Sequence, residues 1–260
     1  MDLAYPLVIK AARAWFKLGD IDIRATGLEH IPDTGGALLA VNHLSYVDYI
    51  IHGYPGAEKG RLTRFIAKKE VFDNKIGGPV MRAFKHIAID RANGAEGMKV
   101  AVEQLHAGEL VGIFVEGTIS NSFLIKDVKT GAARIAAEAG VPLIPVVVWG
   151  TQRILAKGRK LDLSRHKTIG IAVGEPMHLT GEDPVAETAD LKSRMESMLD
   201  TLIREHPADE QPPGSWWLPK AYGGTAPTLE EAAAAYAEER RLREERRQAK
   251  RGDRRPDARA

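Results

Sequence analysis

The sequence predicts an α/β fold, in which a single domain has a central, mostly buried mixed sheet flanked by helices. Three observations support this prediction. Short apolar runs of strand length alternate with longer segments that have helical periodicity. Several of the runs are almost entirely apolar, as expected for strands covered on both faces. Glycine and proline lie at their ends, where the chain turns. We also expect an N-terminal amphipathic helix and a charged helical tail at the C-terminus.

The composition limits the kinds of site that the protein can contain. The 260 residues are enough for one domain with a sizeable core plus appendages, and a formal net charge of +2 gives no reason to expect a nucleic-acid partner. The absence of cysteine excludes disulfides, cysteine-ligated zinc and a cysteine nucleophile. No run approaches the roughly 18–20 apolar residues of a spanning helix, and no signal peptide is recognisable. We therefore expect a protein kept on the cytoplasmic side.

Residues 1–20 are predicted to form an amphipathic helix that associates with a membrane. Lys10, Arg13 and Lys17 are three and four positions apart, so they share one side of the helix. Apolar residues, among them Trp15, fill much of the remaining surface. This pattern suits a helix at a lipid surface, with its lysine stems extended toward the headgroups. A helix packed on the protein's own core has the same pattern.

Residues 21–205 are predicted to form the α/β domain. The chain first turns between residues 22 and 32. Apolar and β-branched runs predict strands at residues 37–42, at the start of 64–72, and at 85–90, 110–115, 141–150 and 168–176. Helical periodicity predicts helices at residues 44–56, 94–107, 129–139 and 184–204. Gly108 and Gly140 end two of these helices.

Residues 206–260 differ in composition from the domain before them. Residues 206–228 are rich in proline and glycine and are interpreted as a linker. Residues 229–251 carry glutamate and arginine blocks at helical spacing, and the basic residues 251–260 are expected to be disordered. A solvated helix with a frayed end is the simpler interpretation of this tail. Attraction to anionic lipid is the functional alternative.

The first candidate catalytic residues follow the predicted strand at residues 37–42. The chain there reads Asn-His-Leu-Ser-Tyr-Val-Asp, with His43 and Asp48 five positions apart. Five residues turn about 500° around a helix, so the two side chains meet only if His43 lies on the turn and Asp48 near the start of the next helix. The carboxylate would then fix the imidazole tautomer and leave the other nitrogen as a base. In isolation, a capping Asn and a surface His explain this pattern more simply.

Two further motifs lie at the ends of apolar strands. In Phe-Val-Glu-Gly-Thr-Ile-Ser, Gly117 lets the backbone approach a ligand, and backbone N–H groups with Thr118 can bind an oxyanion or a phosphate. Glu116 can brace this loop by accepting backbone hydrogen bonds. Arg91 follows Ile-Ala-Ile-Asp and is a candidate phosphate clamp. A plain turn and a surface ion pair are the alternative interpretations.

The order of these motifs, followed by Val-Pro-Leu-Ile-Pro at residues 141–145, resembles the glycerophosphate and lysophosphatidate acyltransferase family. The signatures of that family run His-x₄-Asp, an Ile-Asp-Arg strand end, Phe-Pro-Glu-Gly-Thr-Arg-Ser and Val-Pro-Ile-x-Pro. The similarity covers roughly residues 25–180. The resemblance implies an acyltransferase domain that moves a fatty acyl group from acyl-CoA or acyl-carrier protein to the hydroxyl of a lysophospholipid. The expected acceptor is 1-acylglycerol-3-phosphate, which would give phosphatidate.

The resemblance also implies roles for individual residues. His43 would be the general base and Asp48 would orient it, while Arg91 would bind the acceptor phosphate. The acceptor site would be shaped by Glu116, Gly117 and Thr118. Direct attack on the thioester, without an acyl-enzyme, agrees with the absence of cysteine. The resemblance implies no cofactor and no metal. The expected partners are a membrane lipid and acyl-CoA, with the enzyme peripheral on the cytoplasmic face of the cell membrane.

Two positions depart from the family pattern. Val115 replaces a proline, and Ile119 replaces an arginine that helps to hold the acceptor phosphate. Losing that arginine removes a charge-assisted contact worth about 1.5–3 kcal/mol. Neighbouring lysines can compensate, and Lys68 is assigned to the substrate site with Lys69, Lys126 and Lys129 as further candidates. The apolar groove for the acyl chain is expected among residues 49–54 and 71–84.

Three alternatives remain open at this point. The same chemistry can serve another acceptor, such as a glycolipid or an acylated amino acid, and Ile119 is the feature that favours it. A hydrolase can use His43 and Asp48 as metal ligands, although the sequence offers no convincing third ligand. A non-catalytic membrane adaptor can retain the fold, although the intact His–Asp pair argues against it.

Overall fold

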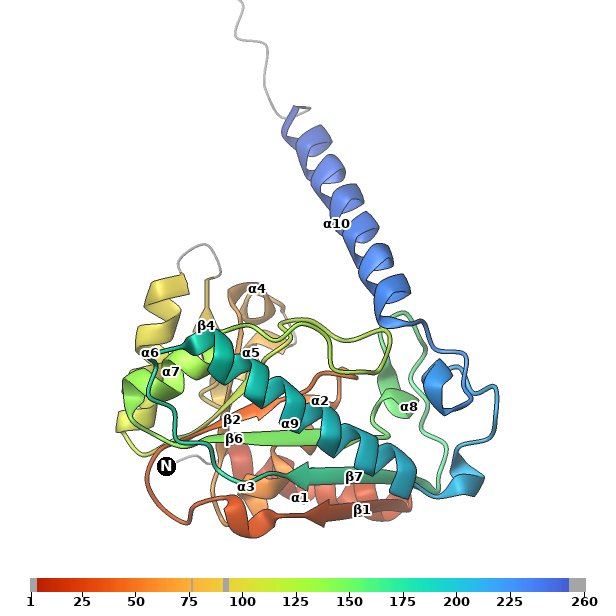
Figure 1. Ribbon diagram of the computed structural model, residues 1–260, viewed down its shortest axis with the longest axis horizontal. Coiled ribbons are helices and arrows are strands. Elements are labelled where there is room, and N and C mark those ends of the chain that lie inside the picture. The colour runs from red at the N-terminus through yellow and green to blue at the C-terminus, as the bar shows by residue number, and fades with distance from the viewer. Residues whose placement is uncertain (1–3, 76, 91–93, 253–260) are drawn as a thin grey trace, which may run out of the picture.

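The computed structural model describes residues 4–75, 77–90 and 94–252 of the chain, and these form one seven-stranded sheet flanked by helices (Figure 1). The spatial order of the strands is β1-β7-β6-β2-β5-β3-β4. Their bounds are β1 Ile21–Thr26, β2 Ala37–Val41, β3 Thr63–Lys68, β4 Ile87–Ile89, β5 Leu110–Phe114, β6 Leu143–Trp149 and β7 Lys167–Val173. The α/β class is confirmed.

The sheet is mixed, as predicted, because β7 and β1 run opposite to the other five strands. β2, β3, β4, β5 and β6 are joined by parallel pairings, β6 pairs antiparallel with β7, and β1 is parallel to β7. Val41 at the end of β2 is in register with Phe114 at the end of β5. Lys68 at the end of β3 is likewise in register with Ile89 of β4. The segments that follow these four strands therefore emerge at one edge of the sheet.

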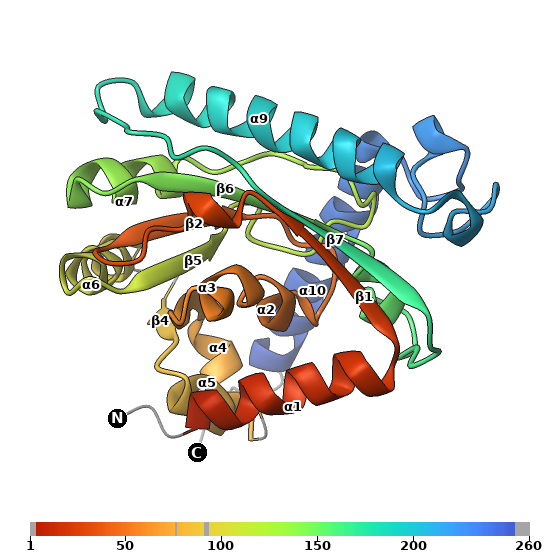
Figure 2. The same cartoon turned by 90° about the horizontal axis from the view of Figure 1, so that it is seen from below.

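Helices cover both faces of the sheet (Figure 2). One face is covered by α6 Gly94–His106, α7 Gly131–Ala139 and α9 Pro184–Glu205, and the other by α1 Ala4–Leu18, α2 Asp48–Ile51 and α3 Tyr54–Glu58. The short helices α4 Lys69–Phe72 and α5 Gly77–Ala83 follow β3, and α8 Gln152–Leu155 follows β6. Every residue of β2 and of β6 is buried. The nearly unbroken apolar runs of these central strands reflect burial on both faces.

Two predicted elements need correction. The chain does not turn throughout residues 22–32, because β1 pairs with β7 at the edge of the sheet. Its residues alternate between half-buried and exposed positions, which is the period-two pattern of an edge strand. The predicted helix at residues 44–56 is also interrupted. Residues 44–47 form turns, and α2 begins only at Asp48. Asp48 therefore lies at the start of the helix that follows the turn, as its predicted pairing with His43 requires.

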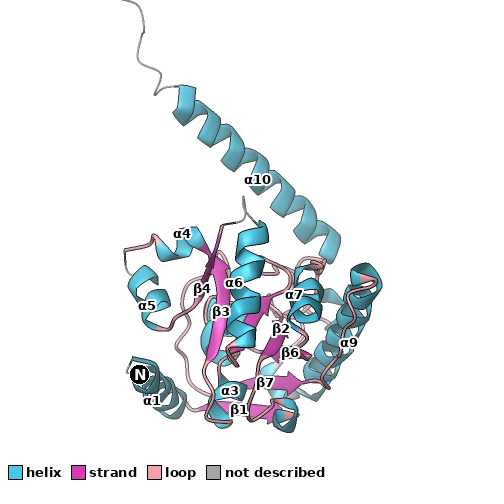
Figure 3. Ribbon diagram, turned by 90° about the vertical axis from the view of Figure 1, so that its left-hand side faces the viewer, coloured by secondary structure: helices cyan, strands magenta, loops and turns pink. Residues whose placement is uncertain are grey.

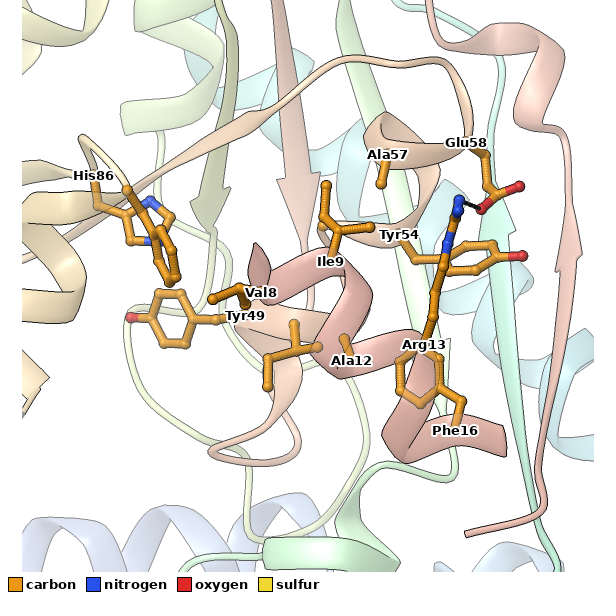
Figure 4. A pocket seen from close by; sticks show the side chains of 13 residues that line it. Val8, Ile9, Ala12, Arg13, Phe16, Tyr49, Tyr54, Ala57, Glu58 and His86 are labelled. Carbon is orange, nitrogen blue, oxygen red and sulfur yellow. Dashed lines mark hydrogen bonds and ion pairs between the residues drawn. The ribbon is translucent and has the colours of Figure 1, made fainter. Parts of the chain in front are cut away.

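The N-terminal helix α1 packs on the domain through one face only. A small apolar slot of about 80 Å³ lies between α1 and the α2–α3 segment, and Figure 4 shows the side chains that line it. Val8, Ile9 and Phe16 line its α1 side, and Arg13 forms an ion pair with Glu58 across it at 2.8 Å. Within the described residues, no helix is both long and apolar enough to cross a membrane.

Residues 206–228 are not the free linker that their composition suggested. Trp217, Leu218 and Ala226 are buried in the core on the α9 face. The Trp217 ring lies 5.9 Å from that of Trp149 and 4.9 Å from the guanidinium of Arg153. This segment therefore contributes to the fold, because two large aromatic rings lose most of their contact with water.

The charged helix α10, Leu229–Gly252, confirms the predicted C-terminal helix and projects away from the domain (Figure 3). Ion pairs three or four residues apart support it, including Arg241 with Glu238 and with Glu245. Of the tail expected to be disordered, residues 253–260 lie outside the described residues.

Candidate functional site

The candidate site lies where the segments after β2 and β5 meet at the edge of the sheet. His43 and Glu116 stand two residues beyond Val41 and Phe114, which are in register. The backbone N–H of His43 donates to Glu116 Oε1 at 3.0 Å, and the N–H of Ser120 donates to the His43 carbonyl at 2.7 Å. These two bonds fix the backbone of His43 against the loop after β5, so the two motifs form one unit.

The structure brings His43 and Asp48 together, as the sequence predicted. His43 Nδ1 lies 2.9 Å from Asp48 Oδ2, which also accepts the N–H groups of Leu44 at 2.6 Å and Ser45 at 2.7 Å. The Asp48 side chain is fully buried, whereas that of His43 is 12% exposed. Because Nδ1 donates to the carboxylate, Nε2 carries the lone pair. The imidazole thus presents its basic nitrogen away from Asp48.

Two aromatic rings, those of Phe114 and Tyr49, hold the imidazole, and neither was expected to contact it. The centroid of the His43 ring lies 4.1 Å from that of Phe114, with 34° between the planes. Tyr49 meets it edge-on at 6.1 Å. Phe114 belongs to the predicted strand before the Glu-Gly-Thr turn, so its position was visible in the sequence but its contact with His43 was not. These contacts restrict the rotation of the ring.

Asn42 and His52 fix the start of the same loop through hydrogen bonds. The Asn42 side chain donates to the Val148 carbonyl at 3.0 Å and accepts the Val148 N–H at 2.9 Å, which ties the end of β2 to β6. His52 Nε2 lies 2.9 Å from the Asn42 carbonyl. Burial lowers the pKa of His52 to about 4 against the opposing influence of Asp48, so His52 is neutral at physiological pH. Neutral His52 therefore serves as a hydrogen-bond donor to the backbone beside His43.

Glu116 braces two segments. Its Oε1 accepts the His43 N–H, and its Oε2 accepts the backbone N–H of Lys126 at 3.2 Å. Burial raises the pKa of Glu116 to about 7, while the Lys126 charge and these hydrogen bonds act in the opposite direction. Glu116 is not one of the described residues that line the neighbouring cavity. The geometry therefore favours the bracing role over the direct substrate contact that the sequence suggested.

The turn after Glu116 is built around Gly117. Gly117 has φ of +71°, a backbone conformation that side chains with a Cβ rarely adopt. Its N–H donates to the Phe114 carbonyl at 2.9 Å. The Gly117 N–H is therefore used within the turn, and the expected binding of an oxyanion or phosphate by backbone N–H groups of this loop stays a prediction. The Thr118 hydroxyl lies beside the cavity and accepts a hydrogen bond from the Lys126 ammonium.

A cavity of about 700 Å³ opens in front of His43. Its walls include apolar side chains from β3, β4, β5, α6 and α7, namely Ile66, Ile89, Ile113, Met98 and Ile135. Tyr49 and Val71 come from the two segments predicted to form the acyl groove. Lys68, Lys129 and Lys157 also line the cavity, and no carboxylate does so among the described residues. The cavity thus combines an apolar wall with positive charge.

Some of the expected substrate residues line the cavity, whereas one of them lies outside the described residues. Lys68 at the end of β3 and Thr118 both line the cavity, and so does Ile119, the position that lacks the family arginine. Arg91 lies outside the described residues, so its expected phosphate contact stays a prediction. Lys157 and Tyr236 were not predicted, since they come from distant parts of the chain and no local motif marks them.

The comparisons with known proteins agree with this geometry. The model of the family described as Acyltransferase matches residues 22–149, which contain the His43–Asp48 pair and Glu116. The 1-acyl-sn-glycerol-3-phosphate acyltransferase of Bacillus subtilis is 30% identical over 157 residues, which cover 60% of this chain and 74% of that protein. The chain belongs to the acyltransferase family. It is therefore an O-acyltransferase.

Two further relatives show how this acyltransferase compares in chain length and in fold. A chloroplast 1-acyl-sn-glycerol-3-phosphate acyltransferase of Arabidopsis thaliana is 28% identical over 171 residues, 64% of this chain and 47% of that protein, so the chain spans about half of its length. The crystal structure of the 1-acyl-sn-glycerophosphate acyltransferase of Thermotoga maritima matches with a TM-score of 0.64 at 24% identity. That match covers 78% of this chain and 80% of the other, and it shows the shared fold.

The metal-dependent alternative finds little support in the geometry of this acyltransferase. His43 Nδ1 and Asp48 Oδ2 bond to each other, which occupies the atoms that would face a shared ion. Within the described residues, no three His, Asp or Glu side chains are grouped so that they could hold a metal. A catalytic zinc site needs three protein ligands.

Proposed function

We propose that this acyltransferase moves a fatty acyl group from acyl-CoA or acyl-carrier protein to the free hydroxyl of 1-acylglycerol-3-phosphate, giving phosphatidate. The observation that carries the proposal is the cavity in front of His43, in which a base, an apolar wall and three lysines meet without a carboxylate among the described residues. The apolar wall suits acyl chains, and the lysines suit an anionic headgroup. Four relatives of bacterial or chloroplast origin carry the name of this activity.

The chemistry needs only one base. His43 Nε2 takes the proton of the acceptor hydroxyl while that oxygen attacks the thioester carbonyl. The tetrahedral intermediate then expels the thiolate, which takes the proton back from Nε2. Buried Asp48 stabilises the imidazolium between these two steps. No residue of the chain becomes acylated, and no cofactor is required beyond the acyl donor. An acyl-enzyme would add the acyl mass to protein incubated with donor alone.

A panel of acceptors tests the proposal. The purified enzyme is given acyl-CoA or acyl-carrier protein together with lysophosphatidate, lysophosphatidylcholine, monoacylglycerol or a lysoglycolipid. We expect phosphatidate from lysophosphatidate to form at least about tenfold faster than the other products, because only that acceptor presents a phosphate monoester to the cavity lysines. Mass spectrometry of the lipid products measures this. Preference for a glycolipid would instead favour the alternative acceptor suggested by Ile119. Failure with every acceptor would favour the adaptor.

We also infer that the enzyme is peripheral on the cytoplasmic face of the cell membrane, with α1 against the lipid. The outward face of α1 presents Leu7 and Leu18, which are 69% and 76% exposed. Lys10 and Lys17 lie between them in the sequence and are exposed as well. Two exposed leucines with lysines beside them suit the boundary between acyl chains and anionic headgroups. The acceptor lipid would enter the cavity from this surface.

Replacing Leu7 and Leu18 together by glutamate is expected to weaken vesicle binding by at least about tenfold, because apolar burial is lost and charge repulsion is gained. Flotation with vesicles that contain phosphatidylglycerol measures the bound fraction. Val185→Glu is the matched control, since Val185 is 71% exposed on α9, on the opposite face of the sheet. Equal vesicle binding by the double variant and the control would show that α1 does not contact the membrane.

A further inference from the structure

We propose that Lys126 and Lys157, gathered around Tyr236 of α10, form the subsite for the phosphate of the acceptor. The proposal rests on the proposed function and names the residues that replace the missing positive charge at position 119. Tyr236 and Lys157 lie outside residues 22–149, the segment matched by the family model. The subsite would thus be completed by a part of the chain beyond the motifs.

Lys126 places its ammonium on the turn where Ile119 has no charge. Its backbone is fixed by the bond from its N–H to Glu116 Oε2 at 3.2 Å. Its Nζ donates to Thr118 Oγ1 and, at 3.3 Å, to the carbonyl of Ile119. The ammonium is therefore held against residues 118 and 119 themselves, although Lys126 is seven positions further along the chain. A phosphate bound at this turn would meet the charge of Lys126 together with the Thr118 hydroxyl.

Tyr236 brings the second ammonium to the same place. The Lys126 Nζ lies 5.8 Å from the centroid of the Tyr236 ring, and the Lys157 Nζ lies 5.9 Å from it. Lys157, Tyr236 and Thr118 all line the cavity. Glu239, also on α10, forms an ion pair with Lys157. One tyrosine therefore lies close to two ammonium groups, of which that of Lys157 lines the cavity and that of Lys126 is bonded to the cavity residue Thr118. Two neighbouring cations suit a group with more than one negative charge.

The position of this subsite suits the acceptor better than the donor. Glu116 accepts the backbone N–H of His43 with one carboxylate oxygen and that of Lys126 with the other, so one side chain holds the backbones of the base and of the cation. In 1-acylglycerol-3-phosphate only a few bonds separate the reactive hydroxyl from the phosphorus. Backbones held by one and the same side chain therefore suit this acceptor. The phosphates of CoA are separated from the thioester by the long pantetheine arm.

Lys126→Met tests the subsite, because it removes the charge and keeps the apolar stem. We expect the KM for lysophosphatidate to rise about 10- to 100-fold with little change in kcat and in the KM for acyl-CoA. Assays are run above pH 7, where Glu116 with its pKa of about 7 is largely ionised. Lys192→Met is the matched control, since Lys192 pairs with Glu196 on the outer surface of α9. The control should leave both KM values unchanged.

Restoring the positive charge at residue 119 makes the test specific. The double variant Lys126→Met with Ile119→Arg should recover most of the lost affinity for lysophosphatidate, because residue 119 lies on the same turn and lines the cavity. Tyr236→Leu should raise the same KM by about two- to fivefold, since it removes the ring that holds both ammonium groups. An unchanged KM for lysophosphatidate in Tyr236→Leu would show that α10 is not part of the subsite.

The results separate the two proposals. If the wild-type enzyme acylates lysophosphatidate while Lys126→Met keeps its KM, the subsite is wrong and the proposed function stands. A rise in the KM for acyl-CoA instead would show that these cations bind the donor. A fall in kcat with both KM values unchanged would show a structural role for Lys126. If the wild-type enzyme acylates no lysophosphatidate, the proposed function itself is wrong.

Discussion

Replacing His43 by alanine is expected to lower kcat/KM for acyl transfer by at least about 10²- to 10⁴-fold, the usual contribution of a general base. His43 presents the basic nitrogen at the cavity wall, and Asp48 Oδ2 is 2.9 Å from its other ring nitrogen. Without the imidazole, the acceptor hydroxyl keeps its proton during attack on the thioester. Steady-state kinetics with labelled acyl-CoA and lysophosphatidate measure the loss.

The fold of the His43→Ala variant is expected to stay intact. The His43 backbone bonds to Glu116 and Ser120 are unaffected by the substitution, so the loop keeps its two anchors. Circular dichroism and thermal unfolding check this. His106→Ala is the matched control, because His106 is exposed at the end of α6, away from the cavity lining. Wild-type turnover by a folded His43→Ala variant would refute the assignment of the base.

Asp48→Asn is expected to lower kcat by about 10³- to 10⁴-fold and also to destabilise the fold. One oxygen of Asp48 accepts bonds from the His43 ring and from the N–H groups of Leu44 and Ser45. A neutral amide accepts these bonds more weakly and does not stabilise the imidazolium formed during the reaction. The side chain is fully buried, so water cannot replace the lost interactions.

We expect the free energy of unfolding of Asp48→Asn to fall by about 2–4 kcal/mol, which chemical denaturation measures. Asp22→Asn is the matched control, since Asp22 forms an exposed ion pair with Arg24 on β1 and should change stability by less than about 1 kcal/mol. If kcat stayed within a few-fold of the wild-type value in a folded Asp48→Asn variant, the carboxylate would have no part in orienting His43. A loss of stability with full activity would leave it a purely structural role.

The elements predicted most accurately are those whose signals are local. The central strands have long apolar runs because they are covered on both faces, and β6 is buried throughout. The helix α7 ends at Gly140, whose φ is +63°. This is the left-handed end that glycine favours. In such cases the residues that decide the structure lie within the element itself.

The prediction failed where partners distant in sequence decide the structure. The strand β1 is short and polar at every second residue, and its pairing with β7 makes it a strand. Residues 206–228 have the composition of a linker, yet Trp217 packs against Trp149 and Arg153. Propensity within a window does not report such contacts, because their free energy comes from burial against residues elsewhere in the chain.

The motifs and the hydrophobic pattern were sufficient to predict the acyltransferase family, the α/β class and the pairing of His43 with Asp48. Their spacing, and their place after a buried strand, leave few geometries in which both side chains can be used. The positions of the other groups around that pair depend on how the folded elements pack against one another. The register of β2 with β5 sets Glu116 beside His43, and the packing of α10 sets Tyr236 beside Lys126. Contacts between separate elements depend on how whole surfaces pack, and no local pattern encodes that packing.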